Sequence, residues 1–151
     1  MVLAFGAVIF IGAPYMPTLK ISCRQALDLL DLKKGQTLVD LGCGDGVMLK
    51  LAADAGFKAV GYEINPFLVL AAKIRTFTYG KKVKVKWGNF WQADLSQADG
   101  VFVFLLDRYM ERLDKKLKNE AKKGTKLVSH AFKIPGKKPA KKIDAMFLYQ
   151  Y

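Results

Sequence analysis

Short apolar runs alternate with stretches of helical periodicity from residue 22 to the end of the chain. The runs predict strands over 37–41, 58–63, 83–87, 101–106, 125–132 and 145–151. Helices are predicted over 22–31, 46–55 and 66–80, and between Leu113 and Ala121. Such alternation indicates an α/β fold: a Rossmann-like, doubly wound, mostly parallel sheet with an antiparallel C-terminal strand.

Local signals place the ends of these elements. Ser22 and Gln25 have the spacing of a capping box, which predicts that the first helix begins there. Asn65 before Pro66 predicts a capped helix start, because proline is tolerated in the first helical turn. Gly124 is expected to end the last helix.

The first thirteen residues carry no charged side chain. As a helix they would span about 20 Å, short of the roughly 30 Å hydrocarbon core of a bilayer. Three interpretations stay open: a segment dipping into a membrane, one end of a longer span, or an element covering the domain. We expect residues 14–151 to form one domain, and the following Lys20, Arg24, Lys33 and Lys34 favour a cytoplasmic location, membrane-associated if the apolar segment dips into a bilayer.

The chain has 151 residues and a formal net charge of +12. This charge suits an anionic partner such as a membrane surface or nucleic acid, or simply keeps the protein soluble. Few arginines and no aromatic-basic RNA motif make nucleic acid the weaker choice. Two cysteines and one histidine predict no disulfide scaffold and no metal site, so Cys23 and Cys43 are interpreted as reduced thiols.

A glycine turn follows the strand predicted over 37–41. Residues 39–46 read Val-Asp-Leu-Gly-Cys-Gly-Asp-Gly, and Glu63 ends the next strand. Glycines at alternate positions allow positive φ and close approach of a ligand, and an acidic residue ending the second strand can accept both hydroxyls of a ribose. A dinucleotide fingerprint is not favoured, because Val47 stands where its third glycine belongs.

Asp40 followed by Gly42, Gly44 and Gly46 resembles the first motif of the class I S-adenosylmethionine-dependent methyltransferases. The resemblance implies the class I methyltransferase fold and S-adenosylmethionine as cofactor, a cationic ligand that suits carboxylates at Asp40 and Asp45. It also implies that Glu63 binds the ribose.

The third strand ends in Trp87-Gly-Asn-Phe. In the same methyltransferases an acidic or amide residue at this place bonds the adenine amino group, a task Asn89 can perform through its side-chain oxygen. Phe90 is predicted either to pack on the adenine or to belong to the core. Trp91 fits the core or the mouth of the acceptor site.

The fourth strand ends in Phe-Leu-Leu-Asp-Arg, without the Asn/Asp-Pro-Pro-aromatic tetrad usual in methyltransferases acting on planar nitrogens of bases or glutamine amides. Asp107 can orient a lysine ammonium there, cap the following helix, or do both. His130 is either a base near the mouth or a hydrogen-bonded structural residue.

The order of Pro14-Tyr-Met-Pro17, the glycine turn, Val60-Gly-Tyr-Glu63 and Val128-Ser-His-Ala-Phe132 resembles small prokaryotic relatives of the mitochondrial protein-lysine methyltransferases acting on the ATP synthase c subunit and the adenine nucleotide translocase. The resemblance implies a lysine ε-amine acceptor on a protein, with membrane proteins among the candidates. Tyr15 and Asp107 are the candidates for holding the amine. An RNA methyltransferase and a non-catalytic S-adenosylmethionine-binding protein stay open as alternatives.

Overall fold

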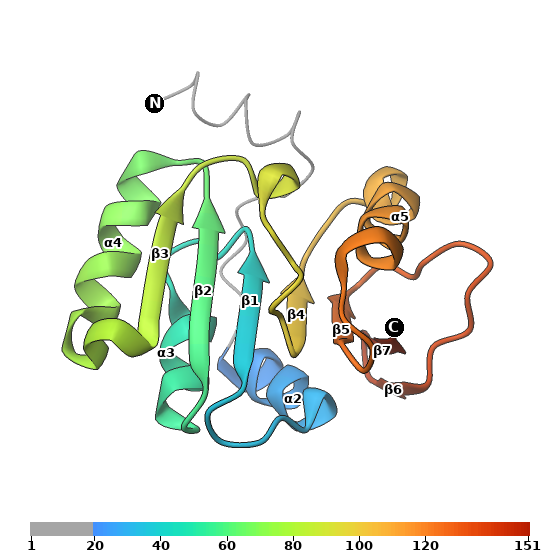
Figure 1. Cartoon of the computed structure of the whole chain (residues 1–151), viewed down its shortest axis with the longest axis horizontal. Helices are drawn as coiled ribbons and strands as arrows, with labels where there is room; N and C mark the ends of the chain where they lie inside the picture. The colour runs from blue at the N-terminus through green and yellow to red at the C-terminus, as the bar shows by residue number, and fades with distance from the viewer. Residues whose placement is uncertain (1–19) are drawn as a thin grey trace.

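A seven-stranded sheet in the order β3-β2-β1-β4-β5-β7-β6 forms the centre of the molecule (Figure 1). The computed structural model describes residues 20–151. Strands β1 to β5 are parallel, and β7 and β6 run antiparallel to their neighbours. The strands are β1 Thr37–Leu41, β2 Lys58–Glu63, β3 Val83–Trp87, β4 Gly100–Val103, β5 Lys126–His130, β6 Lys141–Ile143 and β7 Met146–Gln150.

Helices cover the two faces of the sheet unequally. The helices are α2 Lys20–Leu30, α3 Val47–Asp54, α4 Pro66–Thr76 and α5 Met110–Glu120, with 3-10 turns η1 Phe77–Lys82, η2 Phe90–Gln92 and η3 Asp107–Tyr109. One apolar cluster joins α2 and α3 to the sheet, and α4 packs on β3 and α3. The other cluster joins α5, η2 and the segment after β4 to the opposite face.

The pattern of the sequence predicted much of this arrangement correctly. Strands β1, β2 and β3 have the expected bounds, and β3 lies at the sheet edge as its alternating lysines indicate. Asn65 caps α4, its Oδ1 accepting hydrogen bonds from the N–H groups of Phe67 and Leu68. The doubly wound, mostly parallel sheet is confirmed.

Several boundaries were predicted wrongly. The capping box is wrong because α2 already begins at Lys20, which leaves Ser22 inside the helix. Helix α5 ends at Glu120, since Ala121 is extended, and Gly124 lies beyond it. Strand β5 stops at His130 because Ala131 takes a φ of 72°.

Strand β4 ends at Val103, and α4 ends at Thr76 and continues as η1. Strand β6 was not predicted. Its Lys-Lys-Ile sequence has no strand pattern of its own, and it forms by pairing with β7 across a tight turn in which Asp144 has a φ of 49°.

The apolar segment 1–13 and Tyr15 lie outside the described residues, so the predictions about them stay predictions. In the part of the chain from Lys20 onward, no helix is both long and apolar enough to cross a membrane.

Candidate functional site

The carboxyl ends of the parallel strands bring most of the predicted site residues to one end of the sheet. The glycine turn follows β1, Glu63 ends β2, Asn89 follows β3, and Asp107 follows β4. Because β3, β2, β1 and β4 are neighbours in that order, these groups lie side by side at the carboxyl end of the sheet. Open α/β sheets bind their ligands at this end.

The glycine turn is fixed by backbone geometry that only glycine adopts freely. Gly42, Gly44 and Gly46 have φ values of 86°, 55° and 84°. The N–H groups of Gly42 and Cys43 donate to the carbonyl of Tyr62 at 2.9 and 3.0 Å, which ties the turn to β2. The turn leads directly into α3, with Gly46 as its N-cap. The free N–H groups at the start of this helix therefore lie at the carboxyl end of the sheet, with the site residues.

Glu63 holds the glycine turn and the start of the next loop together. Its Oε2 accepts from the N–H of Gly44 at 2.9 Å, and its Oε1 accepts from the N–H groups of Ile64 and Asn65, both at 2.9 Å. The side chain is only 8% exposed. The carboxylate therefore has a structural task in addition to the ribose binding predicted for it.

Asp40 is a buried acid with no basic side chain opposing its charge within residues 20–151. Burial, and after it the nearby charge of Glu63, raise the pKa of its carboxyl to about 8. An isolated buried carboxylate is costly unless a cation compensates it. This end of the sheet is therefore suited to a positively charged ligand.

The two thiols next to this acid are buried and free. Burial, followed by the charges of Asp40 and Asp45, raises the pKa of Cys23 to about 12. Burial also raises the pKa of Cys43 well above its usual value. Thiols held in the neutral form are poor nucleophiles, so both cysteines act as packing residues.

Asp45 is already paired in this structure. Its Oδ2 lies 2.8 Å from Nη2 of Arg75, and Nε of Arg75 donates to the Asp45 carbonyl at 2.9 Å. The contact joins α4 to the glycine turn. It shows that Asp45 does not face the site as an unpaired charge, and its role toward a ligand stays a prediction. No pattern in the sequence indicated this pair, whose members are thirty residues apart.

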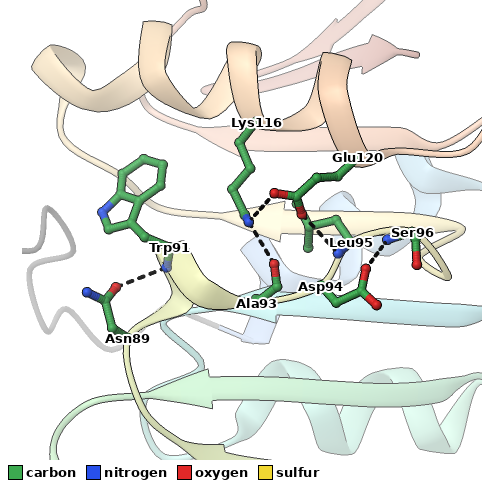
Figure 2. A network of polar contacts seen from close by, with 8 residues as sticks. All are labelled: Asn89, Trp91, Ala93, Asp94, Leu95, Ser96, Lys116 and Glu120. Carbon is green, nitrogen blue, oxygen red and sulfur yellow. Dashed lines mark hydrogen bonds and ion pairs between the residues drawn. The ribbon is translucent and has the colours of Figure 1, made fainter.

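The segment between β3 and β4 is clamped to α5 by a lysine whose side chain is mostly shielded from solvent (Figure 2). Nζ of Lys116 donates to the carbonyl of Ala93 and to Oε1 of Glu120, both at 2.7 Å, and Oε2 of Glu120 accepts from the N–H of Leu95. The Lys116 side chain is only 9% exposed. Sequence reasoning missed this clamp, which holds the loop that carries Asn89.

The side-chain oxygen of Asn89 is hydrogen-bonded within its own loop. Its Oδ1 accepts from the N–H of Trp91 at 2.9 Å and caps η2 (Figure 2). An amide oxygen has a second lone pair, so the bond leaves one acceptor site for a ligand.

Phe90 belongs to the core. It is 4% exposed within the cluster on the α5 face of the sheet, so its ring offers little surface for stacking on adenine. Trp91 is half-buried beside it and packs against Phe90, Tyr109 and the guanidinium of Arg112, which lies 4.1 Å from the indole centroid.

Asp107 is exposed at the start of η3. Among the described residues it accepts no capping hydrogen bond, and the N-cap position of α5 is held by Tyr109, so the N-cap interpretation of Asp107 is wrong. An exposed carboxylate at the end of β4 is accessible to an incoming cation.

His130 ends β5, the strand next to β4. Its ring packs 5.2 Å from Phe104, which in turn lies 6.3 Å from Phe132. Burial lowers the pKa of His130, so the imidazole is neutral at pH 7, and its buried Nδ1 has no hydrogen-bond partner in the described structure. If His130 were a structural residue, as one of the two interpretations holds, its ring should be hydrogen-bonded. Its Nδ1 is not hydrogen-bonded to any residue from 20 to 151. Phe104 and Phe132 were not singled out from the sequence as site residues.

Known proteins share this arrangement. A family model described as the ANTKMT methyltransferase domain matches residues 40–141. A protein-lysine N-methyltransferase of Saccharolobus islandicus is 40% identical over 131 residues, which is 83% of this chain and 81% of the relative. The chain belongs to this methyltransferase family. The ATP synthase c-subunit lysine N-methyltransferase of Rattus norvegicus is 33% identical over 124 residues, 81% of this chain, but the match spans only 57% of the rat enzyme.

Solved structures agree with the family. An RNA methyltransferase of Salinibacter ruber in complex with S-adenosyl-L-homocysteine superposes with a TM-score of 0.84 at 30% identity, over 89% of this chain and 93% of that one. An S-adenosylmethionine-dependent methyltransferase of Thiobacillus denitrificans has a TM-score of 0.62 at 20% identity, over 89% of this chain and 57% of that one, and shows the fold alone.

S-adenosylmethionine is therefore the cofactor of this methyltransferase, and the residues fit it. The buried and uncompensated Asp40 suits a ligand that carries positive charge. Oε2 of Glu63 accepts one backbone N–H beside the glycine turn and keeps a second lone pair for a ribose hydroxyl. When bound, the cofactor supplies an electrophilic methyl group.

Proposed function

We propose that this protein transfers the methyl group of S-adenosylmethionine to a lysine ε-amine of a protein. The observation that carries the proposal is the 40% identity to a relative named protein-lysine N-methyltransferase, over most of both chains. The match to the rat enzyme, named for the c subunit of ATP synthase, points to the same acceptor chemistry.

The sequence at the end of β4 supports an amine acceptor over a base. Methyltransferases of planar nitrogens usually carry a Pro-Pro tetrad at this place, where the present chain has Phe104-Leu-Leu-Asp107. The Salinibacter ruber structure is described as an RNA methyltransferase, so RNA is the competing acceptor that an experiment has to test.

In this proposal the residues at the mouth of the acceptor site have separate roles. A lysine with a pKa near 10.4 costs roughly 4–5 kcal/mol to deprotonate at pH 7, and burial lowers this cost. Asp107 attracts and orients the ammonium as it enters, and Tyr15 is the second candidate for holding the amine. His130 and the rings of Phe104 and Phe132 are the further candidates for lining the acceptor mouth, since Phe104 packs against both of the others.

Cofactor binding in the proposal rests on Asp40, Gly42, Gly44, Glu63 and Asn89. Transfer from a sulfonium to an amine is an in-line displacement that depends on positioning more than on acid-base groups, because the leaving thioether is neutral. The clamp from Lys116 to the loop of Asn89 supplies part of that positioning.

The experiment compares Asp107→Asn with Glu111→Gln. Glu111 is an exposed acid in the first turn of α5, paired with Lys115, and serves as the matched control. With methyl-labelled donor and a cell lysate, the wild-type chain should label protein. Asp107→Asn should lower turnover about tenfold to a hundredfold, the value of one charge-assisted hydrogen bond, with donor affinity nearly unchanged.

Two results would overturn the proposal. The first is label in the RNA fraction and none in protein. The second is an Asp107→Asn variant that loses donor binding and turnover in equal proportion, or that behaves like Glu111→Gln. Binding of donor without transfer to any fraction would favour the non-catalytic alternative.

A further inference from the structure

Helix α4 is apolar on two opposite faces. Its inner face buries Val69 and Ala72, whereas its outer face carries Phe67, Leu70 and Ile74, which are 74%, 58% and 70% exposed. Phe77, at the start of η1, continues the row and is 80% exposed. An apolar face of a helix is normally covered by another apolar surface.

The row, called the outer stripe here, consists of Phe67, Leu70, Ile74 and Phe77. At 3.6 residues per turn these four positions fall within an arc of roughly 80°. Single exposed apolar side chains are common, but a contiguous row of large ones marks an interaction site. A hollow of about 300 Å³, lined by Lys73, Ile74 and Phe77, opens on the stripe.

Trp87 adds an aromatic side chain at the edge of the sheet, at the end of β3. It is 69% exposed, and its Nε1 donates to the carbonyl of Ile64 at 2.9 Å, which fixes the ring at the surface. Strand β3 is an edge strand of the sheet and packs directly against α4 (Figure 1). Tryptophan is enriched at membrane-water interfaces because one part of the ring is apolar and the other can hydrogen-bond.

The stretch of sequence that forms this region carries only basic charged side chains. Residues 64–93 contain no aspartate or glutamate, although the chain has 13 acidic residues. The basic side chains in this range are Lys73, Arg75, Lys81, Lys82, Lys84 and Lys86. Arg75 is paired with Asp45, and the five lysines are exposed. Lys84 and Lys86 lie on the face of β3 opposite α4, because they alternate with Val83 and Val85, so Lys73, Lys81 and Lys82 form the basic rim of the stripe. An apolar row with basic side chains around it is the composition of an interfacial membrane-binding helix.

We propose that the outer stripe of α4, together with Trp87, docks on the surface of an anionic phospholipid bilayer. The apolar side chains enter the boundary between headgroups and acyl chains, and the lysines contact the anionic headgroups. A second copy of the chain fits this face less well, because it would bring two rims of like charge together.

The glycine turn lies against the inner face of α4, on the side of the helix opposite the outer stripe. Arg75 of α4 is bonded to Asp45 in the glycine turn, and a Cβ on Gly46 would lie only 3.0 Å from Ala72, so α4 and the turn form one packed unit. The proposal does not depend on which acceptor is methylated.

The test is sedimentation of the full chain with vesicles. It should bind vesicles of equimolar phosphatidylcholine and phosphatidylserine, bind phosphatidylcholine alone weakly, and lose binding as salt is raised. Replacing Phe67 and Phe77 together by serine should weaken binding at least about tenfold. Lys81→Gln with Lys82→Gln should weaken it about 25-fold, since each lysine contributes roughly fivefold.

The matched controls lie at the opposite edge of the sheet, on and near β6. Ile143→Ser removes an exposed apolar side chain, and Lys138→Gln with Lys141→Gln removes two exposed charges. These controls should bind within about twofold of wild type. All the replaced side chains are exposed, and thermal unfolding verifies that each variant is folded.

Two outcomes contradict the proposal. Equal loss in the stripe and control variants, or no loss in either, would assign vesicle binding to another part of the chain, including its first nineteen residues. A wild-type chain that self-associates through Phe67 and Phe77 and ignores vesicles would assign the stripe to a second copy. The assay contains no methyl-transfer step, so its failure is distinct from failure of the lysine proposal.

Discussion

Replacing Glu63 by alanine should have two separable effects, because the carboxylate both supports the fold and is proposed to bind the ribose. Its oxygens accept three backbone N–H groups, from Gly44, Ile64 and Asn65. Losing them should lower the free energy of unfolding by about 2–4 kcal/mol, less than the sum of three bonds because water reaches these half-buried N–H groups. Losing the hydroxyl contact at the remaining lone pair of Oε2 should weaken donor binding by about 1.5–3 kcal/mol, or roughly 10–10²-fold.

A control variant separates the two effects. Asp99 also accepts a backbone N–H, that of Thr37 at 2.8 Å, and pairs with Lys122, but it lies at the opposite end of β1. Asp99→Ala should therefore destabilise the protein and leave donor affinity unchanged. Urea unfolding gives the stability of each variant, and calorimetric titration with S-adenosylhomocysteine gives the affinity of the folded protein.

The reasoning is refuted if folded Glu63→Ala binds S-adenosylhomocysteine as tightly as wild type. It is also refuted if Asp99→Ala weakens binding to the same degree, because the loss would then reflect general destabilisation.

Three further predictions concern stability. The raised pKa of Asp40, about 8 against about 3.9 unfolded, means that the folded state retains a proton between these values. The free energy of unfolding of wild type, relative to Asp40→Asn, should therefore fall by about 1.4 kcal/mol per pH unit from about pH 4 to about pH 8, measured by urea unfolding. Gly61→Ala should lower the free energy of unfolding by about 1–3 kcal/mol, because the added Cβ would meet two buried side chains at 2.6 Å. Gly88→Ala should lower it far less, because the Cβ added there meets nothing within 4 Å. Lys116→Met should lower the free energy of unfolding by about 2 kcal/mol and speed amide exchange in the 89–96 loop. Lys115→Met, which removes an exposed ion pair, should change the free energy of unfolding by less than about 1 kcal/mol.

Features set by neighbouring residues were the ones the sequence predicted well. The strand before the glycine turn, the acidic residue ending β2 and the Asn65 cap each depend on a few consecutive side chains, and each was confirmed. The family resemblance, carried by the same short motifs, was confirmed as well.

Features set by contacts distant along the chain were missed. The pairs Arg75–Asp45 and Lys116–Ala93 join residues more than twenty positions apart, and β6 exists only through its pairing with β7. The sequence predicted the helix that contains α4, but only the packing shows which of its faces is covered. Phe90 illustrates the same limit, because its apolar ring suits a core and a ligand equally until its burial is known.

The central claim is that the methyl group of S-adenosylmethionine reaches a lysine ε-amine. The most direct measurement incubates the purified chain with methyl-labelled donor and a lysate, hydrolyses the labelled protein to amino acids, and separates the products by chromatography. The account predicts label in ε-N-methylated lysine, absent from a control with heat-inactivated enzyme. Label in RNA nucleosides, or in any amino acid other than lysine, would contradict it.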